Sequence, residues 1–204
     1  MADGGSSELR AYYEAEADRR GRGVLDERRV EVRRRFVDLL RNEHRTNVLD
    51  LGAGPGLDGR GFGDAGIGYV GVDLAHGNCR VAADAGVVVV QGDASALPIR
   101  PASFAAAWSM STLMHLPDDQ ADRALASAAR ALRPGAPWLI GVWGGAGETS
   151  FDDRSIAGER RGFWLRTLDA SRELLGAHGV VEAVEVWEPT RDRWPYHVFR
   201  LRLP

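Results

Sequence analysis

Short apolar runs alternate with segments that have helical spacing of apolar residues along the middle of the chain. The apolar runs predict five strands, at residues 46–51, 69–73, 87–91, 104–108 and 137–143. The segments between them predict helices at residues 56–65, 76–84 and 118–132. Strands that alternate with helices in this way form a parallel sheet with helices on both faces. The pattern therefore predicts an α/β fold around a doubly wound, mostly parallel sheet.

The two ends of the chain add elements to this pattern. Two N-terminal helices are predicted at residues 8–20 and 25–42, and the second has enough helically spaced apolar residues to pack on a sheet face. After a predicted helix at 167–177, residues 180–187 and 197–203 alternate between apolar and polar positions, as strands with one covered face do. These two strands predict an antiparallel pair at the sheet edge, which makes a seven-stranded sheet with an antiparallel edge strand.

Residues 48–59, VLDLGAGPGLDG, contain the strongest functional signal. The apolar run closes on Asp50 and opens into glycines, which let the backbone turn sharply and approach a ligand without an intervening Cβ atom. Residues 54–59 alone also fit the GxGxxG fingerprint of dinucleotide-binding proteins. That fingerprint brings a pyrophosphate to the helix N-terminus, where Asp50 would repel it. Asp50 therefore favours a nucleotide-like cofactor that carries positive charge.

Together with the motifs that follow it in order, this stretch resembles the class I S-adenosylmethionine-dependent methyltransferases. YVGVDL at residues 69–74 supplies the acid that ends the second strand, and residues 87–94 supply an Asp after the third. Residues 103–117 resemble the fourth strand and its HLP loop, and ALRPG at 131–135 resembles the approach to the fifth. The resemblance spans residues 45–145. It implies a Rossmann-like fold, S-adenosyl-L-methionine as cofactor and S-adenosyl-L-homocysteine as product.

The resemblance also implies a cofactor site over the carboxyl ends of the strands. Gly52, Ala53 and Gly54 would wrap the methionine part of the cofactor. Asp50 would lie near this part or brace the loop, and Asp73 would hold the ribose hydroxyls. The other implied contacts are Leu74 on the adenine face, Asp93 and the Ala94 N–H at the adenine edge, and Ser109 and Met110 below the methyl group. Tyr13, with Tyr12 beside it on the first helix, is a candidate to close over the cofactor, because an aromatic ring can face a sulfonium cation; packing on the core is the alternative for at least one of the two. Each acid also has a structural interpretation, as a helix cap or a turn residue.

Methyl transfer displaces a leaving group from an already activated carbon, so the protein mainly holds the nucleophile in line and excludes water. A general base is useful where the acceptor is a hydroxyl group or a protonated amine. Two histidines are candidates for this role: His115, in the loop after the fourth strand, and His197, beside Trp194 and Tyr196. Because the HLP stretch is common in the family irrespective of substrate, a structural or gating role is the favoured interpretation of His115.

The acceptor site is predicted between the N-terminal helices and the long connection at residues 144–166. Three aromatic residues in this connection suit a lid over a polar substrate that contains a ring: Phe151, Phe163 and Trp164. The connection is also rich in glycine and in charged residues, namely Glu148, Asp152, Asp153, Arg154, Glu159, Arg160 and Arg161. A solvated loop with aromatic anchors is the alternative interpretation.

All 26 basic residues are arginine, and 29 acidic residues bring the formal charge to −3. The absence of lysine excludes a Schiff-base lysine and a P-loop lysine. The negative charge gives no whole-chain basic field that would attract nucleic acid. Five arginines do cluster, at positions 28, 29, 33, 34 and 35. Acidic residues interleave with them at spacings that allow ion pairs within a helix, so we predict a solvated helix face.

The 204 residues predict a single methyltransferase domain, with 1–7 disordered, 8–45 a helical cap, 46–145 the cofactor-binding core, and 146–204 the lid connection and edge strands. Cys79 is the single cysteine and has no histidine cluster near it, so neither a disulfide nor a metal site is predicted. No apolar run approaches the roughly 18 residues of a membrane span. The N-terminus lacks the apolar core of a signal peptide. We expect a cytoplasmic protein without membrane or nucleic-acid partners, and leave a homodimer open.

The sequence favours a methyltransferase that acts on an O, N or C nucleophile of a small molecule. A nucleic-acid acceptor is disfavoured because the chain is compact and lacks the Asp/Asn-Pro-Pro-aromatic motif after the fourth strand. Three alternatives stay open: a protein that binds the same cofactor but transfers no methyl group or catalyses a different reaction, a nucleic-acid methyltransferase, and a nicotinamide oxidoreductase. The first of these needs the same cofactor pocket, so turnover alone distinguishes it.

Overall fold

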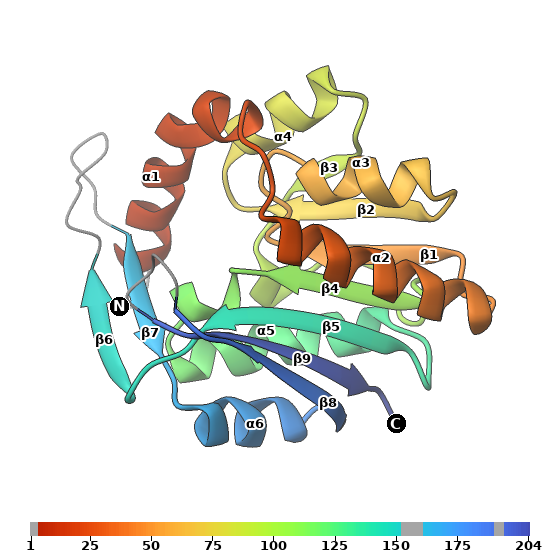
Figure 1. The fold of residues 1–204 in the computed structure, drawn as a ribbon. Coiled ribbons are helices and arrows are strands. Elements are labelled where there is room, and N and C mark those ends of the chain that lie inside the picture. The colour runs from red at the N-terminus through yellow and green to blue at the C-terminus, as the bar shows by residue number, and fades with distance from the viewer. Residues whose placement is uncertain (1–3, 152–160, 190–193) are drawn as a thin grey trace.

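The structure is a computed structural model that describes residues 4–151, 161–189 and 194–204. The strands of its main sheet are β1 (Asn47–Leu51), β2 (Gly68–Asp73), β3 (Val89–Gln91), β4 (Ala106–Met110), β5 (Pro137–Trp143), β8 (Val180–Trp187) and β9 (Tyr196–Arg202). Their order across the sheet is β3-β2-β1-β4-β5-β9-β8 (Figure 1). β9 is antiparallel to β5 and β8, and the other neighbours are parallel. The predicted seven-stranded, mostly parallel sheet with an antiparallel pair at one edge is confirmed.

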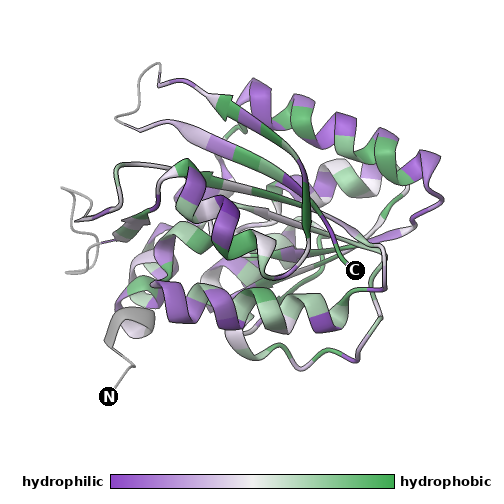
Figure 2. Ribbon diagram, turned by 90° about the horizontal axis from the view of Figure 1, so that it is seen from below, coloured by the Kyte–Doolittle hydropathy of each residue, from purple (hydrophilic) through white to green (hydrophobic). Residues whose placement is uncertain are grey.

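Helices cover both faces of this sheet. One face packs against α2 (Glu27–Asn42), α3 (Leu57–Asp64) and α4 (His76–Asp84), and the other against α5 (Asp118–Ala131) and α6 (Leu168–Gly176). Side chains alternate along β1, so Val48 joins the core beneath α2 and α3, whereas Leu49 and Leu51 join the core beneath α5 and α6. Figure 2 shows the matching pattern in the helices, whose turns alternate between hydrophobic and hydrophilic residues.

Two further elements lie beyond the carboxyl ends of the parallel strands (Figure 1). α1 (Gly4–Gly21) packs on α4. The predicted disorder of residues 1–7 is therefore wrong from Gly4 onward, because these residues extend the helix that packs on α4. A hairpin of β6 (Glu148–Phe151) and β7 (Gly162–Leu165) packs on the short 3-10 helix η2 (Leu113–His115) after β4. The hairpin was not predicted because its strands have four residues each, too few for a clear alternation.

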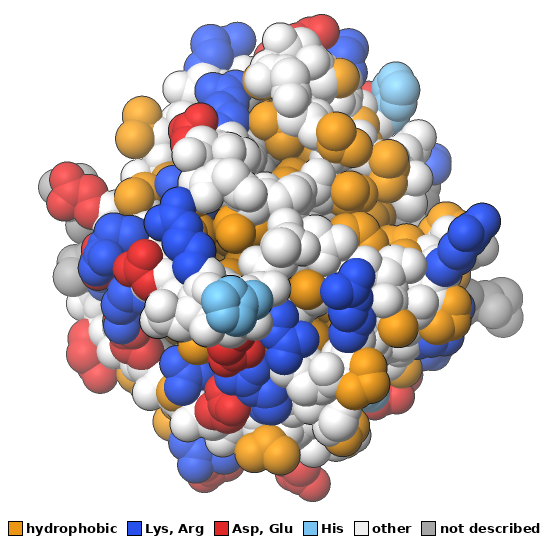
Figure 3. Space-filling model, turned by 90° about the vertical axis from the view of Figure 1, so that its right-hand side faces the viewer, with side chains coloured by type: hydrophobic (Ala, Val, Ile, Leu, Met, Phe, Trp, Pro, Cys, Tyr) orange, Lys and Arg blue, Asp and Glu red, His pale blue; other side chains and the backbone are white. Residues whose placement is uncertain are grey.

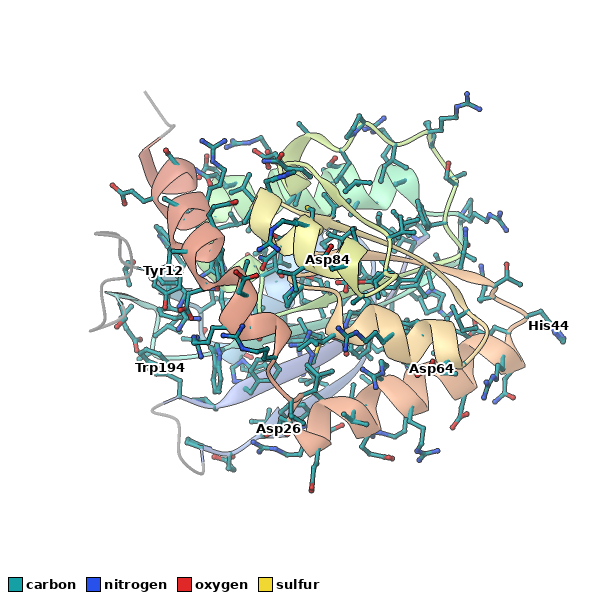
Figure 4. All side chains as sticks on the ribbon, turned by 90° about the horizontal axis from the view of Figure 1, so that it is seen from above. Tyr12, Asp26, His44, Asp64, Asp84 and Trp194 are labelled. Atoms are coloured by element: carbon teal, nitrogen blue, oxygen red, sulfur yellow. The ribbon has the colours of Figure 1, made fainter. Side chains whose placement is uncertain are left out.

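The opposite end of the sheet, where the parallel strands begin, carries arginine and acidic side chains interspersed with apolar ones (Figure 3). His44 lies at this end, whereas Tyr12 on α1 and Trp194 lie at the end with the hairpin (Figure 4). None of the helices that the structure describes is long and apolar enough to cross a membrane. In a doubly wound sheet the ligand binds at the carboxyl ends of the strands, which here are covered by α1 and the hairpin.

Candidate functional site

A cavity of about 280 Å³ lies at the carboxyl ends of β1, β2 and β4, with α1 as one wall. Most residues of the predicted cofactor site line it: Gly52, Ala53, Gly54, Asp73, Leu74, Asp93, Ala94, Met110 and Tyr13. His115 lines it too, together with arginines that the sequence analysis did not connect with the site: Arg10, Arg20, Arg29 and Arg123. The topology thus brings together residues from segments far apart in the chain.

The glycine turn between β1 and α3 forms the floor of the cavity. Gly52, Gly54 and Gly56 have φ values of 69°, 56° and 77°, in the left-handed region that favours glycine. A Cβ atom on Gly52 would collide with the side chain of Thr112, so this glycine is needed for packing. A Cβ atom on Gly54 would meet no atom within 4 Å. The turn is therefore open toward the cavity at Gly54, where a ligand can approach the backbone.

Asp73, at the end of β2, is held in place by three donors. Its carboxylate accepts hydrogen bonds from Gly54 N at 2.8 Å, Ala75 N at 2.9 Å and Asn78 Nδ2 at 3.0 Å. Burial raises the pKa of Asp73, while these donors act in the opposite direction. A carboxylate can accept about four hydrogen bonds, so this fixed group keeps capacity for a ligand hydroxyl.

Asp93 combines both interpretations that the sequence analysis gave it. It caps the 3-10 helix η1 (Ala94–Ala96) by accepting hydrogen bonds from Ser95 N at 2.8 Å and Ser95 Oγ at 2.7 Å. It also lies on the cavity wall with Ala94. The cap fixes the loop after β3, so that the carboxylate and the next backbone N–H lie beside the same cavity.

Three predicted site residues do not line the cavity. Asp50 is 1% exposed and accepts a hydrogen bond from Tyr69 Oη at 2.6 Å; burial, together with the negative charge of Asp58, raises its pKa well above the usual range. Ser109 is fully buried and donates to Leu51 O at 3.1 Å. His197 packs its ring against Phe199, with ring centroids 6.2 Å apart. Asp50 connects β1 to β2 through Tyr69, Ser109 holds the end of β1 just before the turn, and His197 is buried in β9.

Asp58, in the first turn of α3, anchors a buried network that the sequence analysis missed. It is 1% exposed and accepts hydrogen bonds from Arg29 Nε at 2.8 Å, Arg33 Nη1 at 2.8 Å and Trp108 Nε1 at 3.0 Å. The predicted solvated helix face is therefore wrong for Arg29 and Arg33, which point inward, while Arg34 and others in the cluster are exposed. The four-residue spacing of the two inward arginines, which puts them on one helix side, was the available signal.

His115 has both ring nitrogens engaged. Nδ1 lies 2.7 Å from Gly162 O in β7, and Nε2 lies 2.8 Å from the hydroxyl of Tyr13 on α1. A carbonyl oxygen only accepts, so Nδ1 carries the proton and Nε2 accepts from Tyr13. Burial lowers the pKa of His115 to about 3. The imidazole is therefore neutral and connects α1, η2 and the hairpin at the cavity wall.

This lowered pKa predicts a pH-dependent stability. Between the pKa of about 3 in the folded state and the ordinary 6.5, the unfolded chain binds more protons at His115 than the folded chain does. Its stabilising contribution is thus complete above pH 6.5 and is lost as the pH falls toward 3. Urea unfolding should show that wild type loses about 2 kcal/mol more than His115→Gln between about pH 7 and about pH 5. Equal losses would contradict the lowered pKa of His115.

The fold and this site define a class of protein: a doubly wound sheet with a glycine turn after β1 and acids after β2 and β3 is the framework of an S-adenosylmethionine-dependent methyltransferase. Residues 48–135 match the family model described as a methyltransferase domain. The chain therefore contains a methyltransferase domain and has the fold of the class I S-adenosylmethionine-dependent methyltransferases. No relative was found among curated protein sequences.

Solved structures share this fold. The 1,6-didemethyltoxoflavin-N1-methyltransferase of Burkholderia thailandensis, with 1,6-didemethyltoxoflavin and S-adenosylhomocysteine bound, is 25% identical with a TM-score of 0.71, over 97% of this chain and 88% of that chain. A methyltransferase of Methanosarcina mazei is 19% identical with a TM-score of 0.70, over 78% of this chain and 92% of that chain. The [4+2]-cyclase SpnF is 21% identical with a TM-score of 0.63, over 83% and 80%.

The residues on the cavity wall fit S-adenosylmethionine. The open space at Gly54 admits the cofactor to the turn, and the fixed carboxylate of Asp73 keeps capacity for a ribose hydroxyl. The loop after β3 presents Asp93 and Ala94 to the same space. When bound, this cofactor supplies a methyl group on a positively charged sulfur.

Proposed function

We propose that the chain transfers the methyl group of S-adenosylmethionine to an O, N or C nucleophile of a small-molecule acceptor. The observation that carries the proposal is the covering of the site, because α1 and the hairpin lie over the carboxyl ends of the strands (Figure 1). The cavity volume of about 280 Å³ is close to the lower end of the range for small-ligand pockets. A site covered in this way suits a small molecule better than a base in a nucleic-acid duplex.

The acceptor would enter beside Met110, Ser111, Tyr13 and His115, which share the cavity wall near the end of β4. Ser111 has a φ of 63°, which is unusual outside glycine and is held by a hydrogen bond from its N–H to Gly141 O at 2.7 Å. Its Oγ lies 2.9 Å from the hydroxyl of Tyr196. A hydroxyl fixed in this way can orient the nucleophile of an acceptor.

His115 acts in this proposal as a positioning residue and not as the general base. Its Nε2 already accepts a hydrogen bond from the Tyr13 hydroxyl, and its pKa of about 3 makes it a weak base. It orients Tyr13 at the wall, and the acceptor supplies its own lone pair. His197, buried among the strands, has no role in proton transfer here.

The experiment is to incubate the protein with S-adenosylmethionine and either a metabolite library or total RNA. Release of S-adenosylhomocysteine would be followed together with the mass of each acceptor. A metabolite that becomes one methylene unit heavier supports the proposal, and methylation of RNA alone overturns it. A library compound converted without release of S-adenosylhomocysteine would favour the second candidate, a different reaction in a cofactor-bound protein, for which the cyclase of the same fold is the precedent.

A further inference from the structure

Arg20 is a cation on the cavity wall, and one of its hydrogen-bond donors has no acceptor among the described residues. It lies near the end of α1 and lines the cavity. Its Nε is buried and lacks a hydrogen-bond partner within the described part of the chain. Its guanidinium lies over the ring of Tyr13, 5.0 Å from the centroid. A buried N–H of a charged group without an acceptor is costly, so the site is suited to an anionic ligand.

The backbone beside Arg20 is packed on α4, close to the glycine turn. A Cβ atom on Gly21 would collide with Val81 of α4 and would lie 3.7 Å from the Cβ of Pro55 in the turn. This close packing needs the glycine and fixes where α1 ends. Arg20 is thereby held next to the turn that is predicted to wrap the methionine part of the cofactor.

The charge of Arg20 acts on groups in both halves of the site. Burial raises the pKa of Asp73, and the positive charge of Arg20 opposes that rise. Burial lowers the pKa of His115, and the same charge lowers it further. Arg20 therefore lies close enough to act on the acid of the ribose side and on the histidine of the acceptor side.

The other arginines of the wall are less suited to bind an anion in this place. Arg29 is committed to the buried Asp58. Arg123 pairs with Asp119 on α5, with Nη1 and Oδ2 3.0 Å apart. Arg10 is exposed, two turns or more before Arg20 on α1. Arg20 is the cation that combines burial of its Nε with a place beside the turn.

We propose that Arg20 binds the α-carboxylate of the methionine moiety of S-adenosylmethionine and S-adenosylhomocysteine. This carboxylate is the one anionic group of either molecule, and a guanidinium matches it with two parallel N–H donors. The inference extends the cofactor assignment and is independent of the acceptor. The bound carboxylate would also hold the Arg20 guanidinium over the ring of Tyr13. Tyr13 in turn donates its hydroxyl to His115, so binding of the cofactor tail would steady this pair.

The test compares two ligands by calorimetric titration. S-adenosylhomocysteine contains the carboxylate, whereas 5′-methylthioadenosine keeps the nucleoside and the sulfur but lacks the amino-acid tail. Arg20→Gln should weaken the binding of S-adenosylhomocysteine about 10- to 100-fold, which is the range expected for the loss of a hydrogen bond to a charged group. Binding of 5′-methylthioadenosine should change by less than about twofold. Arg20→Lys should recover part of the lost affinity, because it restores the charge without the planar fork.

Arg22→Gln is the matched control, since Arg22 is exposed just after α1 and does not line the cavity. It should leave both affinities unchanged. Equal weakening of the two ligands by Arg20→Gln, or unchanged binding of S-adenosylhomocysteine, would overturn the proposal, with thermal unfolding used to confirm that the variant is folded. If the wild-type protein binds S-adenosylhomocysteine but methylates no small molecule, the proposed function is contradicted, whereas the inference about Arg20 is not affected.

Discussion

Replacing Asp73 by asparagine should weaken the binding of S-adenosylhomocysteine by about 10- to 100-fold, since a hydrogen bond from a ribose hydroxyl to the carboxylate contributes about 1.5–3 kcal/mol. The substitution keeps the size of the side chain but replaces an acceptor oxygen by an amide donor. The new amide donor would face an N–H group of Gly54, Ala75 or Asn78, each of which now donates a hydrogen bond to Asp73. Calorimetric titration of wild type and variant gives the two dissociation constants.

Asp84→Asn is the control for this measurement. Asp84 also lies in this part of the fold, on α4, but it is exposed and pairs with Arg80 at 3.4 Å. Its substitution should leave the dissociation constant unchanged. Because Asp73 also holds backbone groups, thermal unfolding of each variant is recorded beside the titration. A folded Asp73→Asn protein that binds within about threefold of wild type would contradict the assigned role of the carboxylate.

The second large effect is on stability. Asp58→Ala should lower the free energy of unfolding by about 3–5 kcal/mol, because removal of one partner leaves buried charges uncompensated. Arg29, Arg33 and the indole N–H of Trp108 all donate to this carboxylate. The side chains of Arg29 and Arg33 are 22% and 14% exposed, so water replaces the lost acceptor poorly. Urea unfolding, followed by circular dichroism, measures the difference.

Glu31→Ala provides the comparison on the same helix. Glu31 pairs with Arg34 at 2.7 Å, but both side chains are about half exposed. Exposed ion pairs contribute between 0 and about 1 kcal/mol, so this variant should unfold almost like wild type. Similar effects of Asp58→Ala and Glu31→Ala would show that burial does not distinguish the two pairs.

The periodic parts of the fold could be predicted from the sequence because each signal is local. The run around Leu49 and Leu51 and the glycines after it determine a strand and a turn from neighbouring residues alone. Asp73 and Asp93 could be placed because each directly follows an apolar run, and the parallel order of the strands then brings them to one end. Boundaries differ mainly by one or two residues, as at β1 and α3.

Features that depend on contacts between distant segments could not be predicted in this way. Arg29 and Arg33 look like solvated residues until α3 brings Asp58 against them, 25 or more residues along the chain. His115 gave no sign in the sequence that Tyr13 and Gly162 would occupy both of its nitrogens. Of the charged residues predicted in the lid connection, Asp152, Asp153, Arg154, Glu159 and Arg160 lie outside the described residues.

The packing of α1 bears on how fast the enzyme can turn over. Leu9, Tyr13 and Arg20 of this helix form part of the cavity wall, so movement of the helix would widen the exit for the spent cofactor. Within residues 7–21, the buried apolar side chains are Tyr12 and Ala17. Segments with so little buried apolar surface open at a lower free energy than the rest of a fold, and opening steps often limit catalytic rates. We therefore expect product release, paced by detachment of α1, to set the catalytic rate.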